Sequence, residues 1–112
     1  MEWNVDFYKC NGTSPVEEWL LSIDKTARAK IVRNFGLLKQ YGLELKMPYV
    51  RPIGKKLFEV RAKDSHGIYR ILYFAHTGKK FIMLHGFTKK TQKTPAKEID
   101  IAMKRMEKMT DG

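Results

Sequence analysis

The sequence predicts a small α+β fold, an antiparallel sheet with helices packed on one face, in the order β-α-α-β-β-β-α. Three observations predict it. Residues 3–8 alternate apolar and polar side chains, as a half-buried strand does. Residues 15–22 and 24–41 carry helix signals, and residues 56–87 hold three strand-like segments in succession. Runs of helices followed by runs of strands are typical of α+β proteins. At 112 residues we expect residues 1–112 to form a single domain with one modest core.

Each predicted helix has a start signal. Ser14-Pro15-Val16-Glu17 is a capping-box pattern with proline at the first helical position. Asp24 can cap the second helix, and Gly42 can end it. Its apolar stripe is Ala27, Ile31, Phe35, Leu38 and Tyr41. Thr94-Pro95 opens the final helix, whose apolar positions are Ile99, Ala102, Met103 and Met106.

Residues 43–54 contain Pro48, Pro52 and Gly54, which predicts a connecting loop of about a dozen residues. Loops of that length in compact domains are often functional. Tyr49 lies in this segment, and its ring could stack on a nucleotide base.

The three later strands are predicted at residues 56–63, 67–76 and 80–87. If residues 64–67 form a four-residue loop, Arg61 lies directly opposite Arg70. If Thr77-Gly78 is a two-residue turn, Arg70 lies opposite His85. Like charges directly opposed across a sheet are destabilising. The sequence therefore predicts that this row serves a ligand, and a planar guanidinium fork suits phosphate.

The alternative is that Arg61 and Arg70 are surface residues paired with Glu59. We favour anion binding, because Glu59, Arg61 and Arg70 would share one face of the sheet, and one carboxylate cannot neutralise two arginines, a histidine and the nearby lysines. A lone histidine in an apolar strand is more often a packed residue than a catalyst. Beside two arginines, however, a neutral His85 could act as a base.

Lysines stand at both ends of this segment. Lys89, Lys90 and Lys93 link the last strand to the last helix, and Lys55 and Lys56 precede the first of the three strands. Such residues are often only a solvated basic turn. Around an arginine row they would make a basic rim that holds a phosphate backbone.

The overall charge supports a nucleic-acid partner. Lys and Arg total 22 against 12 Asp and Glu, which gives a formal charge of +10. No long amphipathic helix dominates, so membrane binding is the weaker reading. No apolar run is long enough to span a bilayer, no signal peptide is apparent and Cys10 stands alone. We therefore expect a cytoplasmic protein that needs no membrane.

The sequence predicts no metal and no cofactor. The three histidines lack partners at metal-ligand spacing, and no glycine-rich phosphate loop is present.

Three segments resemble the RelE/HigB superfamily of bacterial toxins, most of all its phage-derived HigB-like branch: residues 57–61 (LFEVR), 69–73 (YRILY) and 84–95 (LHGFTKKTQKTP). Arg61 and Arg70 fall where the family keeps basic residues on its sheet, and Lys89 or Lys90 falls where it keeps one after the last strand. Glu59 stands where some members have lysine. The C-terminal tyrosine or histidine of other branches has no counterpart in residues 106–112.

The resemblance implies the toxin of a type II toxin-antitoxin system, which cleaves mRNA on the ribosome and is neutralised by a cognate antitoxin, a helix-turn-helix protein of the HigA kind. We expect a metal-independent endoribonuclease in which the RNA 2′-hydroxyl attacks the adjacent phosphate. Arg61 and Arg70 would stabilise the developing charge. Lys89 and Lys90 would hold the backbone or the leaving oxygen, and Glu59 or His85 would act as general base.

Two other functions stay open. One is a non-catalytic basic module that inhibits translation, or a gyrase-like protein, by occupying its target. The other is an inactive descendant that only binds the antitoxin.

Overall fold

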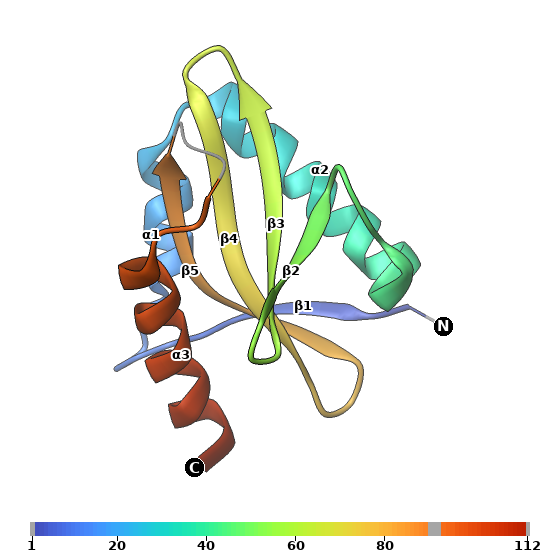
Figure 1. Ribbon diagram of the computed structural model, residues 1–112, viewed down its shortest axis with the longest axis vertical. Coiled ribbons are helices and arrows are strands. Elements are labelled where there is room, and N and C mark those ends of the chain that lie inside the picture. The colour runs from blue at the N-terminus through green and yellow to red at the C-terminus, as the bar shows by residue number, and fades with distance from the viewer. Residues whose placement is uncertain (1, 90–92, 112) are drawn as a thin grey trace.

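The computed structural model describes residues 2–89 and 93–111 (Figure 1). Its elements are β1 (Asn4–Phe7), α1 (Pro15–Ser22), α2 (Lys25–Tyr41), a 3-10 turn (Gly42–Glu44), β2 (Val50–Gly54), β3 (Leu57–Asp64), β4 (Gly67–His76), β5 (Lys80–Lys89) and α3 (Ala96–Asp111). Within these ranges the strands form one five-stranded sheet in the order β1-β5-β4-β3-β2. The α+β prediction is confirmed. One difference is that β1 runs parallel to β5, while the other neighbours are antiparallel.

The helices cover both faces of the sheet rather than the single face that the sequence predicted (Figure 1). Ile71 and Tyr73 of β4 join the core beneath α1 and α2. The alternate residues Leu72 and Phe74 join a second core beneath α3. Because β4 is apolar on both faces, each face must be covered.

The predicted signals place both early helices. The Ser14 hydroxyl accepts a hydrogen bond from the Glu17 amide at 3.1 Å, and the Asp24 carboxylate accepts one from the Thr26 amide at 3.0 Å. Helix α2 ends at Gly42, whose φ of 59° and close contact with the Trp3 ring both favour glycine. Tyr41, predicted to lie in the buried stripe, is instead exposed.

Residues 43–54 are not one connecting loop, as predicted, because they include the edge strand β2. Pro52 is tolerated there since an edge strand has one side without ladder bonds to make. The turn into β3 places Lys55 and Lys56 at φ 53° and 72°. Hairpin turns with two positive φ values usually carry Asn-Gly or Asp-Gly. Two lysines in their place give the sequence no hairpin signal.

One of the two predicted registers is confirmed. Arg61 lies opposite Arg70, as predicted. Arg70, however, lies opposite Phe87, and His85 lies opposite Leu72. The turn is one residue longer than predicted, since His76 pairs with Lys80, and an irregularity at Leu72/Tyr73 adds a second shift. Because the two shifts add up to two residues, His85 stays on the same face of the sheet as Arg70. It lies opposite Leu72 instead of opposite Arg70.

Candidate functional site

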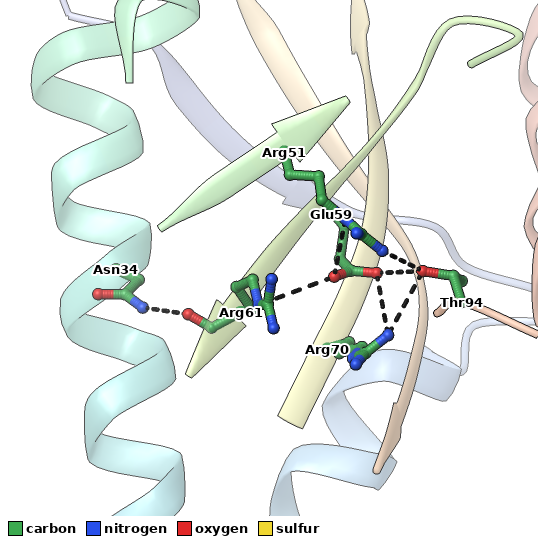
Figure 2. A network of polar contacts seen from close by, with 6 residues as sticks. All are labelled: Asn34, Arg51, Glu59, Arg61, Arg70 and Thr94. Carbon is green, nitrogen blue, oxygen red and sulfur yellow. Dashed lines mark hydrogen bonds and ion pairs between the residues drawn. The ribbon is translucent and has the colours of Figure 1, made fainter. Parts of the chain in front are cut away.

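Five polar side chains meet on the α3-facing side of the sheet, and we call them the arginine cluster (Figure 2). They are Arg51 of β2, Glu59 and Arg61 of β3, Arg70 of β4, and Thr94 just before α3. The strand register produces the group, because Arg51 pairs with Glu59 and Arg61 pairs with Arg70. The expected convergence of Glu59, Arg61 and Arg70 on one face is therefore observed.

Glu59 lies at the centre of the cluster and is fully buried. Its Oε2 is 3.7 Å from an Arg70 Nη atom. Its Oε1 is 3.8 Å from Arg51 Nε and 4.0 Å from Arg61 Nε. Three guanidinium groups against one carboxylate leave a formal excess of two positive charges inside the cluster. An excess of this kind favours an anionic ligand.

Thr94 joins the start of α3 to this site. Its hydroxyl donates to Glu59 Oε2 at 2.6 Å and accepts from an Arg51 Nη at 3.1 Å. An Arg70 Nη lies 3.5 Å from the same oxygen. The sequence singled out neither Thr94 nor Arg51 as site residues. Arg51 was missed because its strand was taken for a loop, and Thr94 was interpreted only as a helix start.

The three arginines differ in exposure, and this separates their roles. The Arg70 side chain is fully buried, whereas those of Arg61 and Arg51 are 12% and 30% exposed. Burial lowers the pKa of Arg70, and repulsion from Arg61 and Arg51 lowers it further, while attraction to Glu59 opposes both. A ligand arriving from solvent therefore meets Arg51 and Arg61, with Arg70 behind them.

His85 lies in a separate group, which we call the histidine cluster, with Glu98 and Arg105 of α3. Its Nε2 is 2.7 Å from Glu98 Oε1, and its Nδ1 is 3.5 Å from an Arg105 Nη. Arginine only donates hydrogen bonds, so the tautomer with Nε2–H facing the carboxylate would satisfy both contacts. The ring also stacks against Phe87. The two arginines expected beside His85 are replaced by one carboxylate and one arginine from α3.

The predicted basic rim is only partly assembled. Lys93 is exposed and directly precedes Thr94. Lys55 and Lys56 occupy the β2–β3 turn, and the strand rise from Leu57, the first residue of β3, to Arg61 is by itself about 13 Å. Lys89 ends β5 opposite Ile68. Lys90 lies outside the described residues.

Tyr49 precedes β2 and is 39% exposed. It lies on a groove between α2 and β3 that also includes Arg61. Tyr69 and Tyr73 belong to the core on the opposite face of the sheet.

Within residues 2–89 and 93–111, no group of three or more His, Cys, Asp or Glu side chains is placed to hold a metal ion. None of the helices in these ranges combines the length and apolar composition that a membrane span requires.

Two comparisons place the chain among known proteins, while no curated protein matches it. Its fold is similar to that of the Escherichia coli toxin RelE, solved as a double mutant in the free state, with a TM-score of 0.63. The match covers 95% of this chain and 99% of that one at 15% sequence identity, so the likeness concerns the fold. Residues 18–107 match the family model described as phage derived protein Gp49-like (DUF891). The chain belongs to this phage-derived Gp49-like family, a family of RelE/HigB-type toxins.

Proposed function

We propose that the protein is the toxin of a type II toxin-antitoxin pair and that it cleaves mRNA on the ribosome. Family membership and the RelE-like fold support the toxin role. The main support for RNA as the target is the arginine cluster, in which three arginines surround one buried carboxylate. The chain's net charge of +10 favours the same class of ligand.

In the proposed reaction the 2′-hydroxyl of one nucleotide attacks its own 3′-phosphate. A bond forms from the 2′-oxygen to phosphorus, and the bond to the 5′-oxygen of the next nucleotide breaks. The 2′-hydroxyl gives its proton to water, and the departing 5′-oxygen takes a proton from water. The products are a 2′,3′-cyclic phosphate and a 5′-hydroxyl end. The guanidinium groups of Arg61 and Arg51 stabilise the negative charge that grows on the phosphoryl oxygens. Arg70 and Glu59 position these two side chains from beneath.

Neither side chain expected as general base is well placed in this conformation. Glu59 is fully buried and accepts a hydrogen bond from Thr94. The two ring nitrogens of His85 face Glu98 and Arg105. We therefore propose that charge stabilisation by the arginines and alignment of the RNA by the ribosome supply most of the rate. Lys93, with Lys89 and Lys90, would hold the flanking backbone.

The proposed antitoxin neutralises the toxin by laying an acidic segment across this basic face, and a helix-turn-helix protein is the form we propose for it. An acidic segment is complementary to the charge excess of the arginine cluster.

The test is inducible expression of the wild type and of Arg61→Ala without antitoxin, with growth followed and mRNA 5′ ends mapped. We expect growth arrest with new ends inside translated frames for the wild type, and neither for Arg61→Ala at equal soluble protein. Lys39→Ala is the control, because it removes an exposed cation of α2 that lies outside the cluster. It should behave as the wild type.

Other outcomes identify the alternatives. Arrest without new RNA ends would replace the nuclease by a module that acts through occupancy. No arrest with abundant soluble wild-type protein would indicate an inactive descendant. Cleavage of naked RNA at the same sites would remove the ribosome from the proposal.

A further inference from the structure

A groove of about 430 Å³ lies between α2 and the end of β3, next to the arginine cluster. It exists because β2 pairs with β3 only as far as Val60. Beyond that point α2 side chains replace a strand: Asn34 Nδ2 donates to the Arg61 carbonyl at 2.8 Å, and Lys30 Nζ donates to the Lys63 carbonyl at 3.1 Å. The Arg61 amide donates to the Tyr49 carbonyl at 2.9 Å. The walls are therefore held by hydrogen bonds.

The groove is lined by four cations, and its described lining includes no acidic residue. The cations are Lys30 and Arg33 of α2 and Arg61 and Lys63 of β3. A cationic lining in a concave site concentrates the field on whatever enters it. Lys30 donates a hydrogen bond to the Lys63 carbonyl, and the side chains of Arg33 and Lys63 are exposed.

An aromatic residue, Tyr49, also lines the groove. Tyr49 is 39% exposed, and the backbone beside it is fixed by hydrogen bonds from the Tyr49 and Val50 amides to the Lys46 carbonyl at 3.1 and 3.2 Å. Cationic grooves combined with aromatic rings are how proteins bind single-stranded nucleic acid, because the charges hold phosphates and each base stacks on a ring. An acidic peptide could form ion pairs with the same cations, but its carboxylates would gain little from contact with the Tyr49 ring.

We propose that this groove binds one nucleotide of single-stranded RNA adjacent to the cleavage site, with its base stacked on Tyr49 and its phosphate held by Arg33 and Lys63. Arg61 belongs to both the groove and the arginine cluster, so one RNA strand passes from one to the other. The inference rests on the proposed function in taking RNA as the substrate. It adds a second subsite that reads one further nucleotide.

Binding is measured by fluorescence anisotropy with a labelled uridine hexamer carrying 2′-O-methyl groups, which cannot be cleaved by the proposed reaction. Arg33→Glu is compared with Lys39→Glu on the same helix, so both variants change the net charge equally and only Arg33 lies in the groove. We expect Arg33→Glu to weaken binding about tenfold more than Lys39→Glu, as lost phosphate contacts should. Thermal melts confirm that both variants are folded.

The stacking is tested with Tyr49→Ala, Tyr49→Phe and Tyr41→Ala. We expect roughly fivefold weaker binding or more for Tyr49→Ala. Tyr49→Phe keeps a ring and should match the wild type, and so should Tyr41→Ala, which removes an exposed tyrosine outside the groove. A hexamer that lacks its bases should bind wild type and Tyr49→Ala equally.

Equal losses for Arg33→Glu and Lys39→Glu would overturn the subsite, because net charge alone would then explain binding. If Tyr49→Ala weakened the binding of RNA and the binding of polyglutamate equally, the proposed RNA subsite would be overturned in favour of a peptide site. Failure of the nuclease proposal is separate: the wild type would cut no mRNA in cells, whatever the uncleavable hexamer shows. Cleavage in cells with no groove-specific loss would overturn the subsite alone.

Discussion

The arginine cluster joins the sheet to Thr94, just before α3, and the histidine cluster joins it to Glu98 and Arg105 of α3 itself, but the two differ in charge balance. In the first, one buried carboxylate faces three arginines. In the second, the Glu98 carboxylate, the His85 ring and one arginine form a chain in which each polar group meets a partner. A balanced group of this kind needs no ligand to explain it. The formal excess of positive charge in the first group is complementary to the RNA phosphate that we propose as its ligand.

The balance also predicts how each cluster responds when one member is removed. A buried charge left without its counter-charge costs several kcal/mol, whereas a charge that keeps other partners costs less. Glu59 lies within 4.0 Å of all three arginines, so it keeps two of these contacts when one arginine is replaced, whereas replacing Glu59 removes an ion pair from each arginine. The two sides of the arginine cluster should therefore respond unequally to substitution.

The largest effect is expected for Glu59→Gln. It removes the carboxylate that forms an ion pair with each of the three arginines, including the fully buried Arg70, and should lower the free energy of unfolding by about 3–5 kcal/mol. Arg70→Met should cost less, because Glu59 keeps Arg51 and Arg61. The double variant should be more stable than Glu59→Gln alone. Urea unfolding at neutral pH measures all three, and equal losses for the two single variants would show that the excess charge has no energetic consequence.

The next effect concerns activity. Arg61→Ala should lower mRNA cleavage on programmed ribosomes about 10²- to 10³-fold, the usual loss when one transition-state donor is removed. Arg61→Lys keeps the charge but loses the planar two-point donor, so we expect an intermediate loss, about tenfold. Single-turnover cleavage rates measure both. If lysine restored full activity, the site would use only charge at this position.

A smaller effect, on stability rather than activity, is expected in the histidine cluster. His85→Gln or Glu98→Gln should lower the free energy of unfolding by about 1–3 kcal/mol, because each removes the ring or the charge of the hydrogen bond between His85 and the Glu98 carboxylate. Both should keep cleavage within about tenfold of the wild type. A stable His85→Gln protein that no longer cleaves mRNA would contradict the purely structural role of the histidine cluster, because His85 would then be a catalytic residue.

The elements that have local sequence signals were predicted correctly. The strand pairing that depends on a longer turn and on an irregular step in the sheet was not. Ser14, Asp24 and Gly42 carry the chemistry of helix ends, so the helix bounds could be predicted. The Arg61–Arg70 pairing followed from a loop of countable length. The His85 pairing did not, because a longer turn and an irregular step moved it by two residues. A β-bulge of this kind has no side-chain signature that a single sequence reveals.

The candidate site was recovered in part, for a similar reason. Alternation along β3 predicted that Glu59 and Arg61 share a face with Arg70, but not that Arg70 is fully buried. Its burial depends on α3 and the segment before it, and the sequence placed all helices on the other face. Arg51 belongs to a strand whose turn is made by two lysines, which no turn preference indicates.

The smallest predicted effect tests the residue that ties the arginine cluster to α3. Thr94→Val keeps the shape of the side chain and removes the hydroxyl that donates to Glu59 Oε2 at 2.6 Å. It should lower the free energy of unfolding by about 1–2 kcal/mol, whereas Thr94→Ser should restore most of the loss. Thr88→Val, at an exposed position of β5, is the matched control and should change stability by less than about 0.5 kcal/mol. Because Arg51 also donates to this hydroxyl, Thr94→Val should lower cleavage as well, and Thr94→Ser should recover it. A loss of stability without any loss of cleavage would show that Thr94 anchors α3 but does not position Arg51, and the arginine cluster would then consist of Glu59 and its arginines alone.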